Sequence, residues 1–176
     1  MLIREATPAD APGIARVHVE SWHTTYKGLI PDQIIASRTH DYRERMWRRI
    51  LTEQRDQTLA YVAEDEGEIV GFVSGGANRD TESVYTGELH AIYILETHQG
   101  KGIGRRLTSA LVARLLQQSH TSMLLWVLAD NHQARRFYEA LGGKVVGERK
   151  EEMDDGLLAE VAYGWDDIRP LLKLDT

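Results

Sequence analysis

The feature that most constrains the fold is a glycine-rich turn between an apolar strand and an amphipathic helix, within residues 88–116. The turn, residues 99–104, has glycine at every second position, which permits positive φ and lets a ligand approach the backbone closely. The helix after it starts with unpaired N–H groups and the positive end of its dipole. Lys101, Arg105 and Arg106 lie here, although acidic residues suit a first helical turn. The stretch therefore predicts a site for a negatively charged ligand.

Length and composition limit the classes of protein that the chain can form. Its 176 residues indicate one domain, residues 1–176. The absence of cysteine excludes disulfides, thiolate metal sites and a cysteine nucleophile. No apolar run approaches the roughly 20 residues that span a bilayer, and the first residues lack the pattern of a signal peptide. The net charge of −6 argues against general nucleic-acid binding. We expect a cytoplasmic protein with neither a membrane nor a nucleic acid as partner.

The hydrophobic pattern predicts alternating strands and helices without internal repeats or linkers. An apolar stripe beginning at Ile103 is typical of a helix, and the continuous apolar run 122–128 is typical of a strand covered on both faces. The expected strands are 2–6, 59–64, 69–74, 88–95, 122–128, 144–151 and 157–165, and the expected helices are 10–26, a short one from Pro31, 39–54, 103–118 and 131–141.

Two well-known glycine-rich phosphate sites do not match the turn. A nucleotide-hydrolase phosphate loop requires Gly-Lys-Ser/Thr, but Lys101 is followed by Gly102. A dinucleotide fingerprint requires G-x-G-x-x-G, and the third glycine would fall at Arg105 or Leu107. A nucleotide-phosphate binder of either kind is therefore disfavoured.

A third kind of site does match. Gln99-x-x-Gly102-x-Gly104, between a strand and a helix, resembles the acyl-CoA-binding motif of the GCN5-related N-acetyltransferases (GNAT). The segment from Asn131 through Phe-Tyr138 to Gly142 is similar to the family's second signature, Asn…Ala…Phe-Tyr…Gly-Phe. The exception is Gly143, where the family usually has an aromatic residue, and we expect looser packing there. The order of predicted elements also resembles the family over nearly the whole chain.

The resemblance implies an α/β (α+β) fold: a single domain with a mixed, mostly antiparallel central sheet of about seven strands, flanked by helices on both faces. It implies acetyl-CoA as the acyl donor and no metal. Backbone amides of the glycine turn would hold the pyrophosphate, and the strand before it would pair with the pantetheine arm. The residues implied in cofactor binding are Ile92, Tyr93, Ile94, Gln99, Gly100, Lys101, Gly102, Ile103, Gly104, Arg105, Asn131, Ala134, Arg135 and Tyr138.

Acetyl transfer to an amine needs a neutral amine and a proton for the departing thiolate. Glu88 lies eleven residues before Gln99, where several histone-acetylating family members have a glutamate base, so the resemblance makes it the first candidate for general base. His90 is the alternative, because it lies two residues on and has a suitable ordinary pKa. Tyr138 matches the second signature and is implied as the general acid.

The sequence gives little indication of the acceptor amine. His18, Trp22 and Tyr26 lie four residues apart on one helix, so Trp22 and Tyr26 are candidates for the substrate pocket, although core packing suits Trp22 better than a pocket wall. We expect a primary amine of a small molecule or peptide. A regulatory acyl-CoA-binding module without catalysis is the alternative, and a homodimer is left open.

Overall fold

The computed structural model describes residues 1–153 and 156–175. The seven strands are β1 (Leu2–Glu5), β2 (Leu59–Asp65), β3 (Glu68–Ala77), β4 (Gly87–Ile94), β5 (Met123–Leu128), β6 (Lys144–Met153) and β7 (Gly156–Trp165). The helices are α1 (Ala11–Tyr26), α2 (Asp32–Ser37), α3 (His40–Glu53), α4 (Ile103–Gln117) and α5 (His132–Ala140), with short 3-10 segments at Pro8–Asp10, Glu96–His98 and Arg169–Asp175. Of the predicted β6–β7 turn, Asp154 and Asp155 lie outside the described residues.

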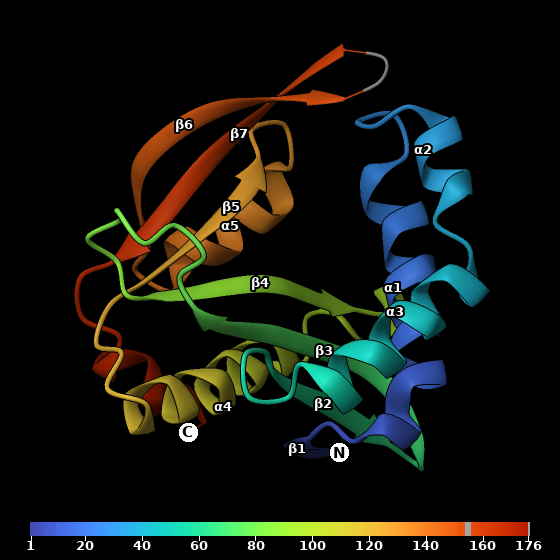
Figure 1. The fold of residues 1–176 in the computed structure, drawn as a ribbon, viewed down its shortest axis with the longest axis horizontal. Coiled ribbons are helices and arrows are strands. Elements are labelled where there is room, and N and C mark those ends of the chain that lie inside the picture. Colours follow the sequence, from blue (N-terminus) through green and yellow to red (C-terminus); the bar gives the residue numbers. More distant parts are fainter. Residues whose placement is uncertain (154–155, 176) are drawn as a thin grey trace.

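The strands form one sheet in the order β1-β2-β3-β4-β5-β7-β6, in which β4 and β5 are the parallel pair. Helices α1 and α3 pack on one face of the β1–β4 half, and α4 packs on the other (Figure 1). The predicted fold class, a mostly antiparallel seven-stranded sheet with helices on both faces, is confirmed. Apolar side chains fill the space between the sheet and the helices on each face, because successive residues of a strand point to opposite faces of the sheet.

The centre of the sheet opens where β4 and β5 diverge. Their register includes Gly87 opposite Met123 and Glu88 opposite Leu124, and after Glu88 the strands separate (Figure 1). On its other edge β4 pairs with β3, but Ser74 faces Ala91 and Gly75 faces Leu89, so His90 is an extra residue in β4. Such a bulge bends a strand and redirects a side chain, which is typical of active sites. The bulge places His90 where the two halves of the sheet separate.

Gly143 is closely packed, and its neighbour leaves no room for a side chain at this position. A Cβ at this position would lie 2.6 Å from Cζ2 of Trp165. The Trp165 indole occupies this space and donates from Nε1 to the carbonyl of Leu141 at 3.0 Å. The expectation of looser packing was therefore wrong, because a tryptophan from β7 fills the space beside the glycine.

Among the described residues, no helix is long and apolar enough to cross a membrane.

Candidate active site

A cavity of about 410 Å³ lies where β4 and β5 diverge. Its walls come from α1, β4, the glycine turn, β5 and α5. The predicted site residues that line it are His90, Ile92, Tyr93, Ile94, Gln99, Gly100, Gly102, Ile103, Gly104, Arg105, Asn131, Ala134, Tyr138 and Tyr26. The structure thus brings most of the predicted cofactor residues to one cavity together with His90 and Tyr138.

The glycines of the turn have two different physical roles. Gly100 and Gly102 have φ of 73° and 78°, a left-handed conformation that is strained for other residues, and a Cβ at either would meet no atom within 4 Å. Gly104 instead allows close packing, since its Cβ would lie 3.0 Å from Cζ of Phe137. Gly102 is the N-cap of α4, whose first turn contains no acidic residue, so the first N–H groups of the helix are available to an anion.

Two side chains link this turn to the other half of the sheet. Gln99 Nε2 donates to the carbonyl of Ile94 at 3.1 Å, and Gln133 Nε2 donates to Gln99 Oε1 at 2.9 Å. Asn131 accepts from the backbone N–H of Ala134 at 3.2 Å and also lines the cavity. It therefore caps α5, as the sequence allowed, while it shapes the cavity wall.

Tyr138 reaches the cavity from α5. Its ring packs against Phe137, Tyr163 and Trp165, with centroid separations of 5.4, 5.9 and 6.5 Å. Burial raises the pKa of the Tyr138 hydroxyl above its usual value. The hydroxyl therefore keeps its proton at neutral and moderately alkaline pH, as a proton donor in the cavity must.

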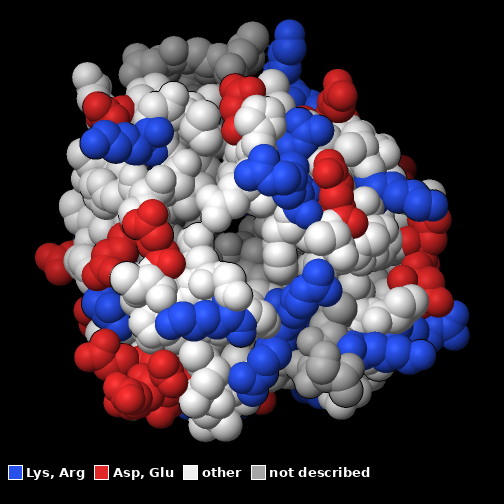
Figure 2. Space-filling model, turned by 180° about the vertical axis from the view of Figure 1, so that it is seen from behind, with Lys and Arg blue, Asp and Glu red and all other residues white. Residues whose placement is uncertain are grey.

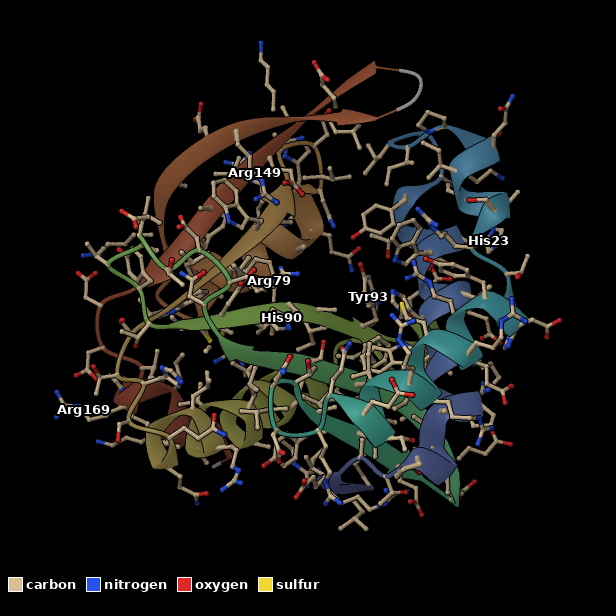
Figure 3. All side chains as sticks on the ribbon, in the orientation of Figure 1. His23, Arg79, His90, Tyr93, Arg149 and Arg169 are labelled. Atoms are coloured by element: carbon tan, nitrogen blue, oxygen red, sulfur yellow. The ribbon has the colours of Figure 1, made fainter. Side chains whose placement is uncertain are left out.

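Glu88 and His90 are neighbours with different surroundings. The buried Glu88 carboxylate accepts from the backbone N–H, Nε and Nη2 of Arg79, at 3.1, 3.0 and 2.5 Å. Burial raises the pKa of Glu88, but the hydrogen bonds from Arg79 outweigh this effect and the pKa is lowered. Burial lowers the pKa of His90 to about 4, so its ring is neutral at pH 7. Figure 3 labels Arg79 and His90, which lie close together beside β4.

The α1 side of the cavity is aromatic. The hydroxyls of Tyr26 and Tyr93 are 2.8 Å apart, and both residues line the cavity. The Trp22 ring packs on Tyr26 at a centroid separation of 5.0 Å. Tyr26 is thus a wall residue, as its hydroxyl suggested, whereas Trp22 packs behind the wall.

Some predicted residues are outside the cavity lining, namely Glu88, Lys101, Arg135 and Trp22. The guanidinium of Arg135 donates to Tyr163 Oη at 3.1 Å and to the carbonyl of Ala129 at 2.9 Å, so it binds within the β5–α5–β7 region. Sequence reasoning missed other lining residues, among them Ser21, Thr25, His98, Trp126, Gln133 and Glu160. Ser21 and Thr25 lie four residues apart on α1 and Ser21 lies three residues after His18, so helical spacing is the signal that could have found them.

Figure 2 shows acidic and basic side chains interspersed over the face opposite that of Figure 1, with basic side chains beside a central hollow. Among the described residues, no group of three or more His, Asp or Glu could hold a metal ion.

The family model described as the Acetyltransferase (GNAT) family matches residues 20–143. The chain belongs to the GNAT family. A GNAT relative from Bacillus subtilis, the uncharacterized N-acetyltransferase YuaI, is 38% identical over 98% of this chain and 96% of its own. The L-methionine sulfoximine/L-methionine sulfone acetyltransferase of Salmonella typhimurium is 30% identical over 84% of this chain and 82% of its own. The protein is thus a GNAT acyltransferase.

Solved GNAT structures share the fold of this chain. The PaiA N-acetyltransferase from Thermoplasma acidophilum, in complex with coenzyme A, has a TM-score of 0.73 and 22% identity, covering 93% of this chain and 98% of that one. The yncA protein of Salmonella typhimurium, with acetyl-CoA, has a TM-score of 0.67 and 24% identity, covering 94% of this chain and 92% of that one. The fold therefore occurs in proteins that bind coenzyme A or acetyl-CoA.

Proposed function

We propose that this GNAT protein transfers acetyl directly from acetyl-CoA to a primary amine of a small molecule or peptide. One observation carries the proposal: a single cavity joins the glycine turn, the diverging edge of β4 and the side chains of His90 and Tyr138. The name of the Salmonella relative, which refers to small amino-acid derivatives, supports a small-molecule acceptor.

The donor end of the cavity fits acetyl-CoA. The first N–H groups of α4 and the open space at Gly100 and Gly102 suit a pyrophosphate. Beyond Glu88 the β5-facing backbone groups of β4 suit the amides of the pantetheine arm, as in strand addition. Arg105 lines this end and suits a phosphate oxygen. When bound there, acetyl-CoA supplies an activated acetyl thioester.

We assign the proton transfers to the cavity residues. His90, neutral and in the lining, accepts the proton of the acceptor amine directly or through water. Glu88 was the first candidate from the sequence, and its engagement with Arg79 favours a supporting role as the charge that faces His90. Tyr138 donates a proton to the sulfur as the C–S bond breaks and the C–N bond forms. A backbone N–H of β4 near Ile94 polarises the thioester carbonyl.

A free-thiol assay with acetyl-CoA and a panel of primary amines tests the proposal. We expect release of CoA that depends on the amine and a product heavier by one acetyl group in mass spectrometry. Tight binding of acetyl-CoA with no turnover on any amine would favour the non-catalytic acyl-CoA-binding module. Protection against thermal unfolding by ATP but not by acetyl-CoA would indicate a nucleotide-phosphate site instead.

A further inference from the structure

Unpaired buried polar atoms gather on one side of the cavity. Within the described residues, five buried side-chain atoms lack a hydrogen-bond partner: Ser21 Oγ, Trp22 Nε1, Arg43 Nε, Arg43 Nη2 and His90 Nε2. The first four come from α1 and α3. Buried polar groups in native proteins almost always have a hydrogen-bond partner, so a cluster of unpaired groups indicates a binding site. The Ser21 hydroxyl and the two Arg43 nitrogens are hydrogen-bond donors, which points to a partner with acceptor oxygens.

Arg43 is the strongest of these exceptions, because it carries a charge. The residue is only 7% exposed, and burial lowers the pKa of its guanidinium. Its hydrogen bond is a weak one from Nη1 to Sδ of Met46 at 3.7 Å. Its guanidinium otherwise stacks over the Trp22 ring at 4.6 Å from the centroid and lies 5.8 Å from that of Tyr42.

No described acidic side chain forms an ion pair with Arg43. A buried charge without a partner is strongly unfavourable, so a chain that keeps one has a use for it.

The charge of Arg43 acts on the cavity wall. Arg43 stacks on Trp22, Trp22 packs on Tyr26, and the hydroxyl of Tyr26 is hydrogen-bonded to that of Tyr93. Burial raises the pKa of Tyr93, and the hydroxyl of Tyr26, the indole of Trp22 and the positive charge of Arg43 act against this rise. The field of Arg43 therefore reaches the oxygen atoms that line the cavity.

The α1 side of the cavity also provides hydrogen-bond donors. The two tyrosine hydroxyls use one hydrogen in their mutual bond, which leaves the other free. Ser21 lines the same side and its hydroxyl has no partner. Together they provide two O–H donors, as many as a carboxylate has oxygen atoms.

The other charges near this wall do not cancel that of Arg43. Glu160 lines the cavity and its charge contributes to the raised pKa of Tyr26, but its carboxylate accepts a hydrogen bond from Nε of Arg149 at 2.6 Å. Arg38 is a further cation near Arg43. In Figure 3, Tyr93 lies beside α1 and α3, whereas Arg149 lies on the β6–β7 hairpin on the other side of the opening. The uncompensated charge on the α1 side is positive.

We propose that the acceptor amine carries a carboxylate, as amino acids do, and that Ser21, Tyr26 and Tyr93 bind it with Arg43 as the buried countercharge. This inference rests on the proposed acetyltransferase function. The carboxylate takes no part in the transfer, in which the amine forms the C–N bond. It orients the acceptor, with its anionic end at α1 and its amine towards His90 and the thioester.

Matched acceptors test the proposal. CoA release is measured with L-amino acids and, for each, its carboxamide, which differs in the carboxylate alone. We expect kcat/KM of the wild-type protein to be at least about tenfold higher for the carboxylate member. A carboxamide lowers the pKa of the neighbouring amine, so a larger fraction of that amine is neutral at pH 7, and this acts against the expected preference. A wild-type ratio at or below one for every pair would overturn the proposal.

Variants of α3 identify the residue responsible. We expect Arg43→Gln to bring the ratio close to one, mainly through KM of the amino acid, and Arg43→Lys to keep part of the preference. Arg45→Gln, an exposed arginine on the same helix, should leave the ratio unchanged. An unchanged ratio in Arg43→Gln would contradict the role of Arg43. If that variant does not fold, Tyr26→Phe should lower the ratio in the same direction.

Failure of the proposed function gives a different result. If no amine releases CoA, calorimetric titration of the CoA-bound wild-type protein with an L-amino acid and with its carboxamide still tests the site. Binding of the amino acid alone would support a carboxylate site without turnover, and equal or absent binding of both would refute it.

Discussion

The carboxylate of Glu88 lies 3.8 Å from Nε2 of His90 and accepts three hydrogen bonds from Arg79. Arg79 keeps Glu88 ionised. Burial and the positive charge of Arg79 lower the pKa of His90, and the negative charge of Glu88 raises it. His90 lines the cavity and Glu88 does not. In the mechanism that we propose, His90 contacts the acceptor and Glu88 tunes that histidine.

His90→Ala should lower kcat/KM by roughly a hundredfold at pH 7, within the usual range for a general base. The pKa of His90 is about 4, so its ring can accept a proton throughout the pH range in which the acceptor amine titrates. As the pH rises towards the pKa of the amine, the amine loses its proton to water and the defect should shrink. The pH dependence of kcat/KM for the wild-type and variant proteins measures this convergence.

Glu88→Gln should be less harmful than His90→Ala, with a loss of about tenfold, because it makes His90 a weaker base without removing it. Glu82→Gln, an exposed substitution in the adjacent loop, serves as its control. A larger loss in Glu88→Gln than in His90→Ala would restore Glu88 as the direct base.

Tyr138→Phe should lower kcat by about a hundredfold or more and change the Kd of acetyl-CoA by less than about threefold. Burial raises the pKa of this hydroxyl, so the wild-type kcat should not decline up to about pH 9 through loss of its proton. Single-turnover rates and calorimetric titrations provide the two quantities. Tyr85→Phe, which removes a hydroxyl bound to Asp166, is the matched control. Equal losses in kcat and affinity would contradict the acid role of Tyr138.

Gly102→Ala should weaken acetyl-CoA binding by at least about tenfold, because the left-handed backbone at φ 78° disfavours a Cβ and the turn must relax. The strain itself should lower the free energy of unfolding by about 1–2 kcal/mol. Gly67→Ala is an apt control, since Gly67 has φ of 84° in the β2–β3 turn and equally open surroundings. We expect the same destabilisation there, with unchanged acetyl-CoA affinity. A similar rise in Kd for both variants would show that strain alone is responsible.

Stability should fall in mild acid because of His18. This histidine accepts from Nε1 of Trp47 at 3.1 Å, and burial lowers its pKa to about 2. The unfolded chain, with a histidine pKa near about 6.5, binds the proton first, so stability falls as pH drops below that value. At pH 4.5 the loss from this group is about 3 kcal/mol.

His18→Gln should therefore show a shallower decrease of Tm between pH 7 and pH 4.5 than the wild-type protein. The exposed His23 lies on the same helix, and His23→Gln should keep the wild-type slope. Parallel curves for wild type and His18→Gln would refute this origin of the acid sensitivity.

The parts of the site that follow from local chain chemistry were predicted correctly in position. The left-handed glycines at 100 and 102 and the N-cap at Asn131 depend only on residues close in sequence, so local sequence is sufficient to predict them. Tyr138 was predicted through a motif on a single helix. The wall residues Trp126 and Glu160 carry no such local signal, because each faces the cavity only through the pairing of β5 and β7.

The alternation of apolar residues, the glycine turn and the capping residues by themselves determined the order of strands and helices, because these signals act within a few residues. The family was indicated by the resemblance of two local motifs, at residues 99–104 and 131–142. Tertiary structure decided which polar atoms face one another. Three features arise where distant segments meet: the extra residue at His90, the hydrogen bonds from Arg79 to Glu88, and the burial of Arg43 without a carboxylate partner. Their energies depend on register and burial, which a one-residue bulge changes without altering the periodicity of the strand.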